Sequence, residues 1–149
     1  MDLREAGKAR SIGVSNFMPE HLNRIIEATG VTPAVNQIEL HPTFQQRDCV
    51  AFNADQGIVT QSWSPLGQGE TLKDQRITAI ADRLGATPAQ VIIAWHLAKG
   101  YSVIPKTGNV DRLASNFAAN GVTLSSDDVS AIDAMDDANG RMGPDPATF

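Results

Sequence analysis

The sequence has little of what marks several large protein classes. Cys49 is the single cysteine among 149 residues, so neither an internal disulfide nor a cysteine-based zinc site is possible. No apolar run approaches the roughly 18 residues of a membrane span, and the N-terminal segment lacks the apolar core of a signal peptide. We therefore expect a cytoplasmic protein without a membrane partner.

Positive charge and metal ligands are also sparse. The formal net charge of −5 comes from 17 acidic and 12 basic residues, without a long run of either sign. A nucleic-acid-binding surface needs clustered Lys and Arg, so we expect no nucleic-acid partner. The three histidines, His21, His41 and His96, do not have the spacing of metal ligands, and we predict no metal site.

The chain alternates short β-like runs with segments of helical periodicity. This alternation, in a chain that is 42% hydrophobic, predicts a single α/β domain over residues 1–149 with a parallel sheet. An irregular tail is expected from about residue 137 to 149, where Gly, Pro and Asn are frequent. The predicted strands are 11–15, 34–40, 58–63 and 102–105. The predicted helices begin near residues 19, 47, 87, 110 and 125. One further helix is predicted before residue 87, with Ile77, Ile80, Ala81 and Leu84 on one face.

Two helix starts carry a specific signal. Thr87 is followed three residues later by Gln90, and Ser125 is followed at the same spacing by Asp128. Such pairs form capping boxes, in which each side chain satisfies a free backbone amide of the first turn. We therefore predict helices that begin directly after Thr87 and Ser125.

Four peptides at the ends of the predicted strands carry a resemblance to a known family. They are GKARSIGVSNF at 7–17, NQIELHP at 36–42, WSPLG at 63–67 and IPKT at 104–107. In this order the chain resembles the aldo-keto reductases, and most closely the bacterial members similar to 2,5-diketo-D-gluconate reductase. The resemblance implies a (β/α)8 TIM barrel, of which this chain would be the C-terminal half, equivalent to strands five to eight. In such barrels the functional groups lie at the C-terminal ends of the strands, where these peptides fall.

The resemblance implies an NADPH site. Trp63 would stack on the nicotinamide ring, and three polar side chains would hydrogen-bond its carboxamide: Ser15, Asn16 and Gln37. The rest of the cofactor would meet Leu66 and Gln68 at the pyrophosphate, Lys106, Thr107 and Arg112 at the 2′-phosphate, and Asn116 at the adenine. Two cations and a hydroxyl suit a dianionic phosphate, which favours NADPH over NADH. Ser115 stands where relatives often have Glu, and no glycine-rich dinucleotide fingerprint is expected in this fold.

The resemblance also implies what this chain would lack. The catalytic acid of the family is a Tyr assisted by Lys, Asp and His, all from the first four βα units. Tyr101, the only tyrosine, precedes a predicted strand and would lie at the opposite face of the barrel. His41 is expected to brace a loop rather than to catalyse. We therefore predict no catalytic residue in the chain.

The predicted function is the reduction of an aldehyde or ketone by NADPH, in an enzyme whose cofactor-binding half is this chain. Two alternatives remain open: a non-catalytic NADP(H)-binding module and an inactive remnant. A complete enzyme of this type is expected to be monomeric. An isolated half barrel would expose two sheet edges and an apolar face, so the chain alone is expected to self-associate.

Overall fold

The computed structural model describes residues 2–148, and the chain divides into two compact units. The first unit is formed by Met1–Ile38 and Arg47–Gln61, and the second by Glu39–Gln46 and Ser62–Phe149. Four strands are hydrogen-bonded in the order β1, β2, β3 and β4, which is also their order along the chain. The predicted α/β class with a parallel sheet is confirmed.

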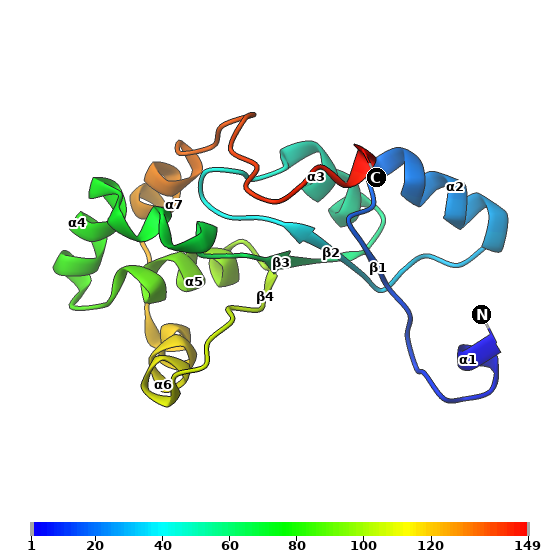
Figure 1. Cartoon of the computed structure of the whole chain (residues 1–149), viewed down its shortest axis with the longest axis horizontal. Helices are drawn as coiled ribbons and strands as arrows, with labels where there is room; N and C mark the ends of the chain where they lie inside the picture. Colours follow the sequence, from blue (N-terminus) through cyan, green and yellow to red (C-terminus); the bar gives the residue numbers. More distant parts are fainter. Residues whose placement is uncertain (1, 149) are drawn as a thin grey trace. The chain divides into compact units, whose positions relative to one another are not determined.

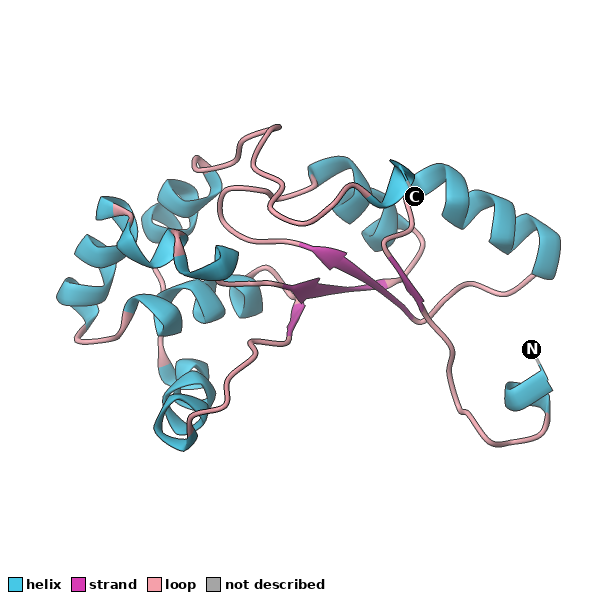
Figure 2. Ribbon diagram, in the orientation of Figure 1, coloured by secondary structure: helices cyan, strands magenta, loops and turns pink. Residues whose placement is uncertain are grey.

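The first unit alternates helices and strands. In chain order it contains α1 (Asp2–Glu5), β1 (Val14–Ser15), α2 (Pro19–Thr29), the start of β2 (Val35–Glu39), α3 (Arg47–Asp55) and the start of β3 (Val59–Trp63). β1 and β2 are neighbouring strands (Figure 2). They run parallel, with Val14 opposite Asn36 and Ser15 opposite Gln37. In this register Ser15, at the end of β1, lies beside Gln37 of β2.

The ends of α2 follow from its sequence. Pro19 is the first helical residue, where no amide donor is needed. Gly30 ends the helix with φ 67°, and its amide donates to the carbonyl of Ile26 at 2.8 Å. At the start, the amide of Met18 donates to Nδ1 of His21 at 3.2 Å. The predicted start near residue 19 is confirmed, and His21 has a capping role.

The second unit is mainly helical. It contains α4 (Gln75–Leu84), α5 (Pro88–Ala98), β4 (Ser102–Val103), α6 (Val110–Ala118) and α7 (Ser126–Asp133). Short 3₁₀ turns η1 to η4 lie at Gly67–Gly69, Thr71–Lys73, Ala119–Gly121 and Pro146–Thr148. α5 packs against both α4 and α7 (Figure 1). The six consecutive residues from Val91 to His96 are all buried, so α5 forms the centre of this unit's core.

Both predicted capping boxes are present. The amide of Gln90 donates to Oγ1 of Thr87 at 3.2 Å, and the side chain of Gln90 accepts from the Thr87 amide at 2.9 Å. Ser125 and Asp128 form the same reciprocal pair at the start of α7. Local sequence therefore determines these two helix starts.

Two strands are shorter than predicted. The expected strands at 11–15 and 102–105 reduce to Val14–Ser15 and Ser102–Val103. The amide of Ile104 still donates to the carbonyl of Ser62 at 3.4 Å, but Pro105 has no amide to continue the pattern. Within residues 2–148, no helix has both the length and the apolar character that crossing a bilayer requires.

Candidate functional site

Three of the predicted site residues lie at strand ends in the first unit. Ser15 and Gln37 occupy paired positions of β1 and β2, and the Ser15 hydroxyl donates to the Gln37 carbonyl at 3.0 Å. The amide of Asn16 donates to the same carbonyl at 2.9 Å. The Gln37 side-chain amide donates to Oε1 of Gln61 on β3 at 2.6 Å. The structure thus brings Ser15, Asn16 and Gln37 together, and Gln61 is a neighbour that the sequence did not reveal.

A buried polar cluster lies beside these strand ends. Asn36 is fully buried and forms two bonds with Phe17: Nδ2 donates to its carbonyl at 2.8 Å, and Oδ1 accepts from its amide at 3.3 Å. Nδ2 of Asn36 also approaches Oδ1 of Asn53 at 3.4 Å, and Asn53 donates to Oγ1 of Thr60 at 3.0 Å. The cluster therefore fixes the backbone directly after Asn16.

Cys49 belongs to the same buried region. Its thiol donates to the Phe17 carbonyl at 3.5 Å, and burial raises the pKa of the thiol to about 11. A thiol that stays protonated at neutral pH is a poor nucleophile. Cys49 is therefore a small buried side chain rather than a nucleophile.

Backbone strain occurs in both units at or beside predicted site residues. Among residues 2–148, four residues other than glycine have positive φ, and three of them belong to or adjoin the predicted site: Asn16 (60°), Ser64 (49°) and Gln68 (51°). Side chains at such φ cost about 1 kcal/mol or more and are frequent at functional sites. Asn16 follows β1 in the first unit, whereas Ser64 and Gln68 belong to the turn that follows Trp63 in the second unit.

That turn is closed by hydrogen bonds within the second unit. The amide of Gly67 donates to the Ser64 carbonyl at 2.9 Å, and the amide of Gly69 donates to the Leu66 carbonyl at 2.9 Å. The hydroxyl of Thr71 donates to the Leu66 carbonyl at 2.8 Å. Leu66 and Gln68, two predicted site residues, are held on this turn, and the Gln68 side chain is exposed.

Three further site residues lie around the start of α6. The side chain of Asn109 caps the helix by accepting from the amide of Arg112 at 3.0 Å. The hydroxyl of Thr107 accepts from the Asn109 amide at 3.1 Å. Lys106 and Arg112 are exposed, and neither side chain forms an ion pair among the described residues. Two free cations at a helix N-terminus suit an anion.

Asn116 lies farther along α6 and lines an apolar groove. This groove of about 380 Å³ lies between α5, β4 and α6 of the second unit. Its walls include Leu97, Val103, Leu113 and Phe117. Asn116, Asn120 and Ser102 add polar groups to these walls. A few polar groups among apolar walls are an arrangement that a flat heteroaromatic ring can use.

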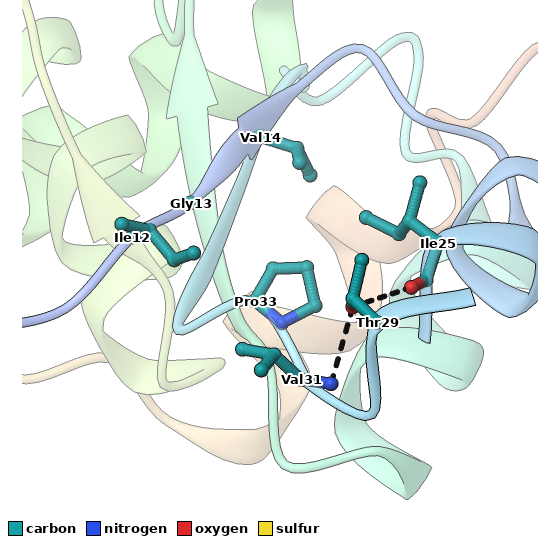
Figure 3. A pocket seen from close by; sticks show the side chains of 7 residues that line it. All are labelled: Ile12, Gly13, Val14, Ile25, Thr29, Val31 and Pro33. Carbon is teal, nitrogen blue, oxygen red and sulfur yellow. Dashed lines mark hydrogen bonds between the residues drawn. The ribbon is translucent and has the colours of Figure 1, made fainter. Parts of the chain in front are cut away.

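A second cavity, in the first unit, contains none of the predicted site residues. It has a volume of about 220 Å³ and lies between β1 and the end of α2. Figure 3 shows the lining residues Ile12, Gly13, Val14, Ile25, Thr29, Val31 and Pro33. The Thr29 hydroxyl is already used, since it donates to the Ile25 carbonyl at 2.6 Å and accepts from the Val31 amide at 3.2 Å. The cavity offers packing surface and no chemistry.

His41 and Tyr101, neither of which is expected to catalyse, both contact other side chains. His41 is fully buried, with Nδ1 at 3.0 Å from Oγ1 of Thr43 and Nε2 at 3.3 Å from Oε1 of Glu39. Burial lowers the pKa of His41 against the opposing effect of Glu39. Tyr101 packs edge-on against the rings of Trp95 and His96. His41 braces its loop as expected. Across residues 2–148, no group of three or more His, Cys, Asp or Glu could hold a metal ion.

Comparison with known proteins gives one consistent family. The model of the aldo/keto reductase family matches residues 1–137. An aldo-keto reductase of Mycolicibacterium smegmatis is 53% identical over 147 residues, which are 99% of this chain and 53% of that protein. The methylglyoxal reductase DkgA of Salmonella typhimurium is 50% identical over 149 residues, covering 99% of this chain and 54% of that protein. The chain thus spans about half the length of the curated relatives it matches.

Solved structures agree. A mutant of Gox0644 in complex with NADPH matches 99% of this chain and 55% of its own, with 54% identity and a TM-score of 0.97. A putative 2,5-diketo-D-gluconic acid reductase B matches 96% of this chain and 51% of its own, with 30% identity and a TM-score of 0.92.

Proposed function

The chain belongs to the aldo/keto reductase family, and we propose that it provides the NADPH-binding part of an enzyme that reduces an aldehyde or ketone to an alcohol. The observation that carries the proposal is the likeness, over nearly the whole chain, to a structure in complex with NADPH. The methylglyoxal reductases among the relatives support a small reactive aldehyde as substrate.

We further propose that the four strands correspond to strands five to eight of a (β/α)8 barrel and that residues 1–149 form one partial domain of it. The parallel pairing of β1 and β2 and the position of the signature peptides at strand ends support this correspondence. The catalytic Tyr would then come from polypeptide outside these residues. A cytoplasmic location and a monomeric complete enzyme stay predictions.

Ser15, Asn16 and Gln37 fit the carboxamide end of the cofactor. A carboxamide offers both a donor and an acceptor, and the side chains of Asn and Gln can complement both. The strand pairing and the Asn36 cluster hold the backbone of these residues, which keeps their side chains in a fixed position. A fixed ring orientation matters because hydride transfer requires the donor and acceptor carbons to be close.

Trp63 fits the stacking role, since the indole offers a broad apolar surface at the end of β3. The strained turn after it fits a loop over the pyrophosphate, with Leu66 and Gln68 as its contacts. In this proposal the cofactor supplies the hydride, and residues of this chain orient the ring and exclude water from it.

Lys106, Thr107 and Arg112 fit the 2′-phosphate. Two exposed cations, a hydroxyl and the first turn of α6 offer both charge and donors to a dianion. NADH lacks the 2′-phosphate, so the proposal includes a preference for NADPH. The apolar groove with Asn116 would hold the adenine.

The experiment is a fluorescence titration of the 149-residue chain with NADPH, with the Trp63→Phe variant as the control. Saturable quenching that disappears in the variant is the expected result. Absence of quenching in the unmodified chain would contradict the proposal and leave an inactive remnant as the explanation. Quenching together with turnover of methylglyoxal by the chain alone would contradict the proposal that the catalytic Tyr lies outside these residues.

A further inference from the structure

Glu39 is a buried carboxylate that binds the C-terminal segment of the second unit. Its side chain has no exposed surface. Oε1 accepts from the amides of Met142 at 2.7 Å and Gly143 at 3.1 Å, and Oε2 also accepts from Gly143 at 3.1 Å. Bonds from backbone amides to a buried carboxylate are strong, because the acceptor carries the charge.

The charge of Glu39 is balanced locally. Nη1 of Arg141 lies 3.7 Å from Oε2, and the same guanidinium lies 4.7 Å above the ring of Phe44. Nε2 of His41 lies 3.3 Å from Oε1, within hydrogen-bond distance, but burial lowers the pKa of His41, so Arg141 is the source of positive charge. A buried carboxylate needs such partners, since an uncompensated charge would be costly. Glu39 and its partners therefore form a binding site for the segment that contains Met142 and Gly143.

This segment lies directly against Trp63. A Cβ atom built on Gly143 would come within 2.5 Å of Cη2 of Trp63 and 3.0 Å of Oε2 of Glu39. No larger residue fits at position 143 without movement of the indole or of the carboxylate. Glycine thus allows the backbone to touch both groups at once.

The loop of residues 39–46 strengthens this attachment. The side-chain amide of Gln45 donates to the carbonyls of Ile132 and Asp133 at the end of α7, and its backbone amide donates to Asp136 at 2.8 Å. The amide of Asp137 donates to the Thr43 carbonyl at 3.2 Å. The segment 136–143 has no regular secondary structure, yet it is held along its length.

We propose that Glu39 is a positioning residue: it holds segment 136–143 against Trp63 and so fixes the indole that the proposed function assigns to the nicotinamide. The inference rests on that function for the role of Trp63. The clamp itself, defined as Glu39 with the amides of Met142 and Gly143, can be tested without the cofactor. Its loss would weaken NADPH and NADH equally, because both carry the same nicotinamide.

The test compares Glu39→Gln with the matched variant Glu27→Gln, an exposed residue of α2. The chain is labelled with 5-fluorotryptophan, and the ¹⁹F resonances of the two tryptophans are assigned with Trp63→Phe. We expect Glu39→Gln to shift the Trp63 resonance, to leave that of Trp95 in place and to speed amide exchange at residues 142–143 at least tenfold. Binding of both cofactors should weaken about tenfold, as loss of one charge-assisted bond predicts.

Gly143→Ala tests the same contact from the segment's side and leaves the carboxylate intact. It should move the Trp63 resonance and weaken both cofactors by a similar factor. An unchanged Trp63 resonance in both variants would overturn the clamp. A shifted resonance with unchanged affinity would overturn the positioning role. Failure of the unmodified chain to bind NADPH, with the resonance shifts present, would overturn the proposed function and the positioning role and leave the clamp standing.

Discussion

The two groups of residues proposed for the ends of the cofactor are built differently. In the first unit, Ser15, Asn16 and Gln37 are tied to paired strands and to a buried polar cluster. In the second unit, Lys106 and Arg112 are exposed on a loop and on the first turn of α6, without ion pairs among the described residues. One group is fixed by its surroundings, whereas the other is free to adapt.

This difference follows from what each end of a dinucleotide requires. Placing a reacting carbon allows little error, so the nicotinamide end needs a backbone that is held by many bonds. Attracting a phosphate depends on charge, which acts over several ångströms and tolerates flexible side chains. The two groups should therefore respond differently to mutation, to acid and to the choice of cofactor.

Removing the centre of the buried cluster should have the largest effect. We expect Asn36→Ala to lower the free energy of unfolding by about 2–4 kcal/mol, because it leaves the Phe17 amide and carbonyl and Asn53 without their partner. Urea denaturation measures the change. The exposed residue Asn23 provides the control, and Asn23→Ala should change the free energy by about 0.5 kcal/mol or less. Equal changes in the free energy of unfolding of the two variants would show that the Asn36 cluster does not hold the first group in place.

Acid should destabilise the second unit before the first. Burial lowers the pKa of His96 from 6.5 to about 3, because the charged imidazolium would lose its hydration in the core, and this effect outweighs the hydrogen bond to the Pro65 carbonyl. The unfolded chain therefore binds a proton that the folded chain does not, and stability is lost as the pH falls from 6.5 toward 3. We expect amide exchange to accelerate first in α5. Substituting His96 by Gln, whose side chain can still donate to the Pro65 carbonyl, should flatten this dependence. A pH profile that is unchanged by His96→Gln would exclude this histidine as the cause.

Arg112 tests the adaptable group. Loss of a charged bond to phosphate costs about 1.5–3 kcal/mol, so Arg112→Ala should weaken NADPH binding roughly 10- to 150-fold and leave NADH nearly unchanged. The protein should remain as stable as before, because the Arg112 side chain is exposed. Fluorescence titrations with both cofactors measure the ratio, with Arg24→Ala as the control. Equal weakening of both cofactors would show that Arg112 does not bind the 2′-phosphate.

The sequence predicted the elements and the strand-end peptides because these depend on local signals. Helix starts at Thr87 and Ser125 are set by residues three positions away, and both are confirmed. The clamp could not be predicted, since the amides that bind Glu39 lie 103 and 104 residues farther along the chain. Gln61 and Asn53 are polar residues at ordinary positions of a strand and a helix, and only the fold reveals their partners.

The left-handed backbone at Gln68 could not be predicted from the sequence either. Its substitution by glycine should have the smallest effect of those considered. Glutamine pays a steric cost at φ 51°, whereas glycine does not. Gln68→Gly should therefore stabilise the chain or leave its free energy of unfolding within about 1 kcal/mol of the original, although glycine raises the entropy of the unfolded state. In α4, where φ is negative, Ala79→Gly should instead destabilise by about 1 kcal/mol. Opposite signs in urea denaturation would mark the turn as strained. Destabilisation of both variants to the same extent would mean that the Gln68 side chain contributes more contacts than the strain costs.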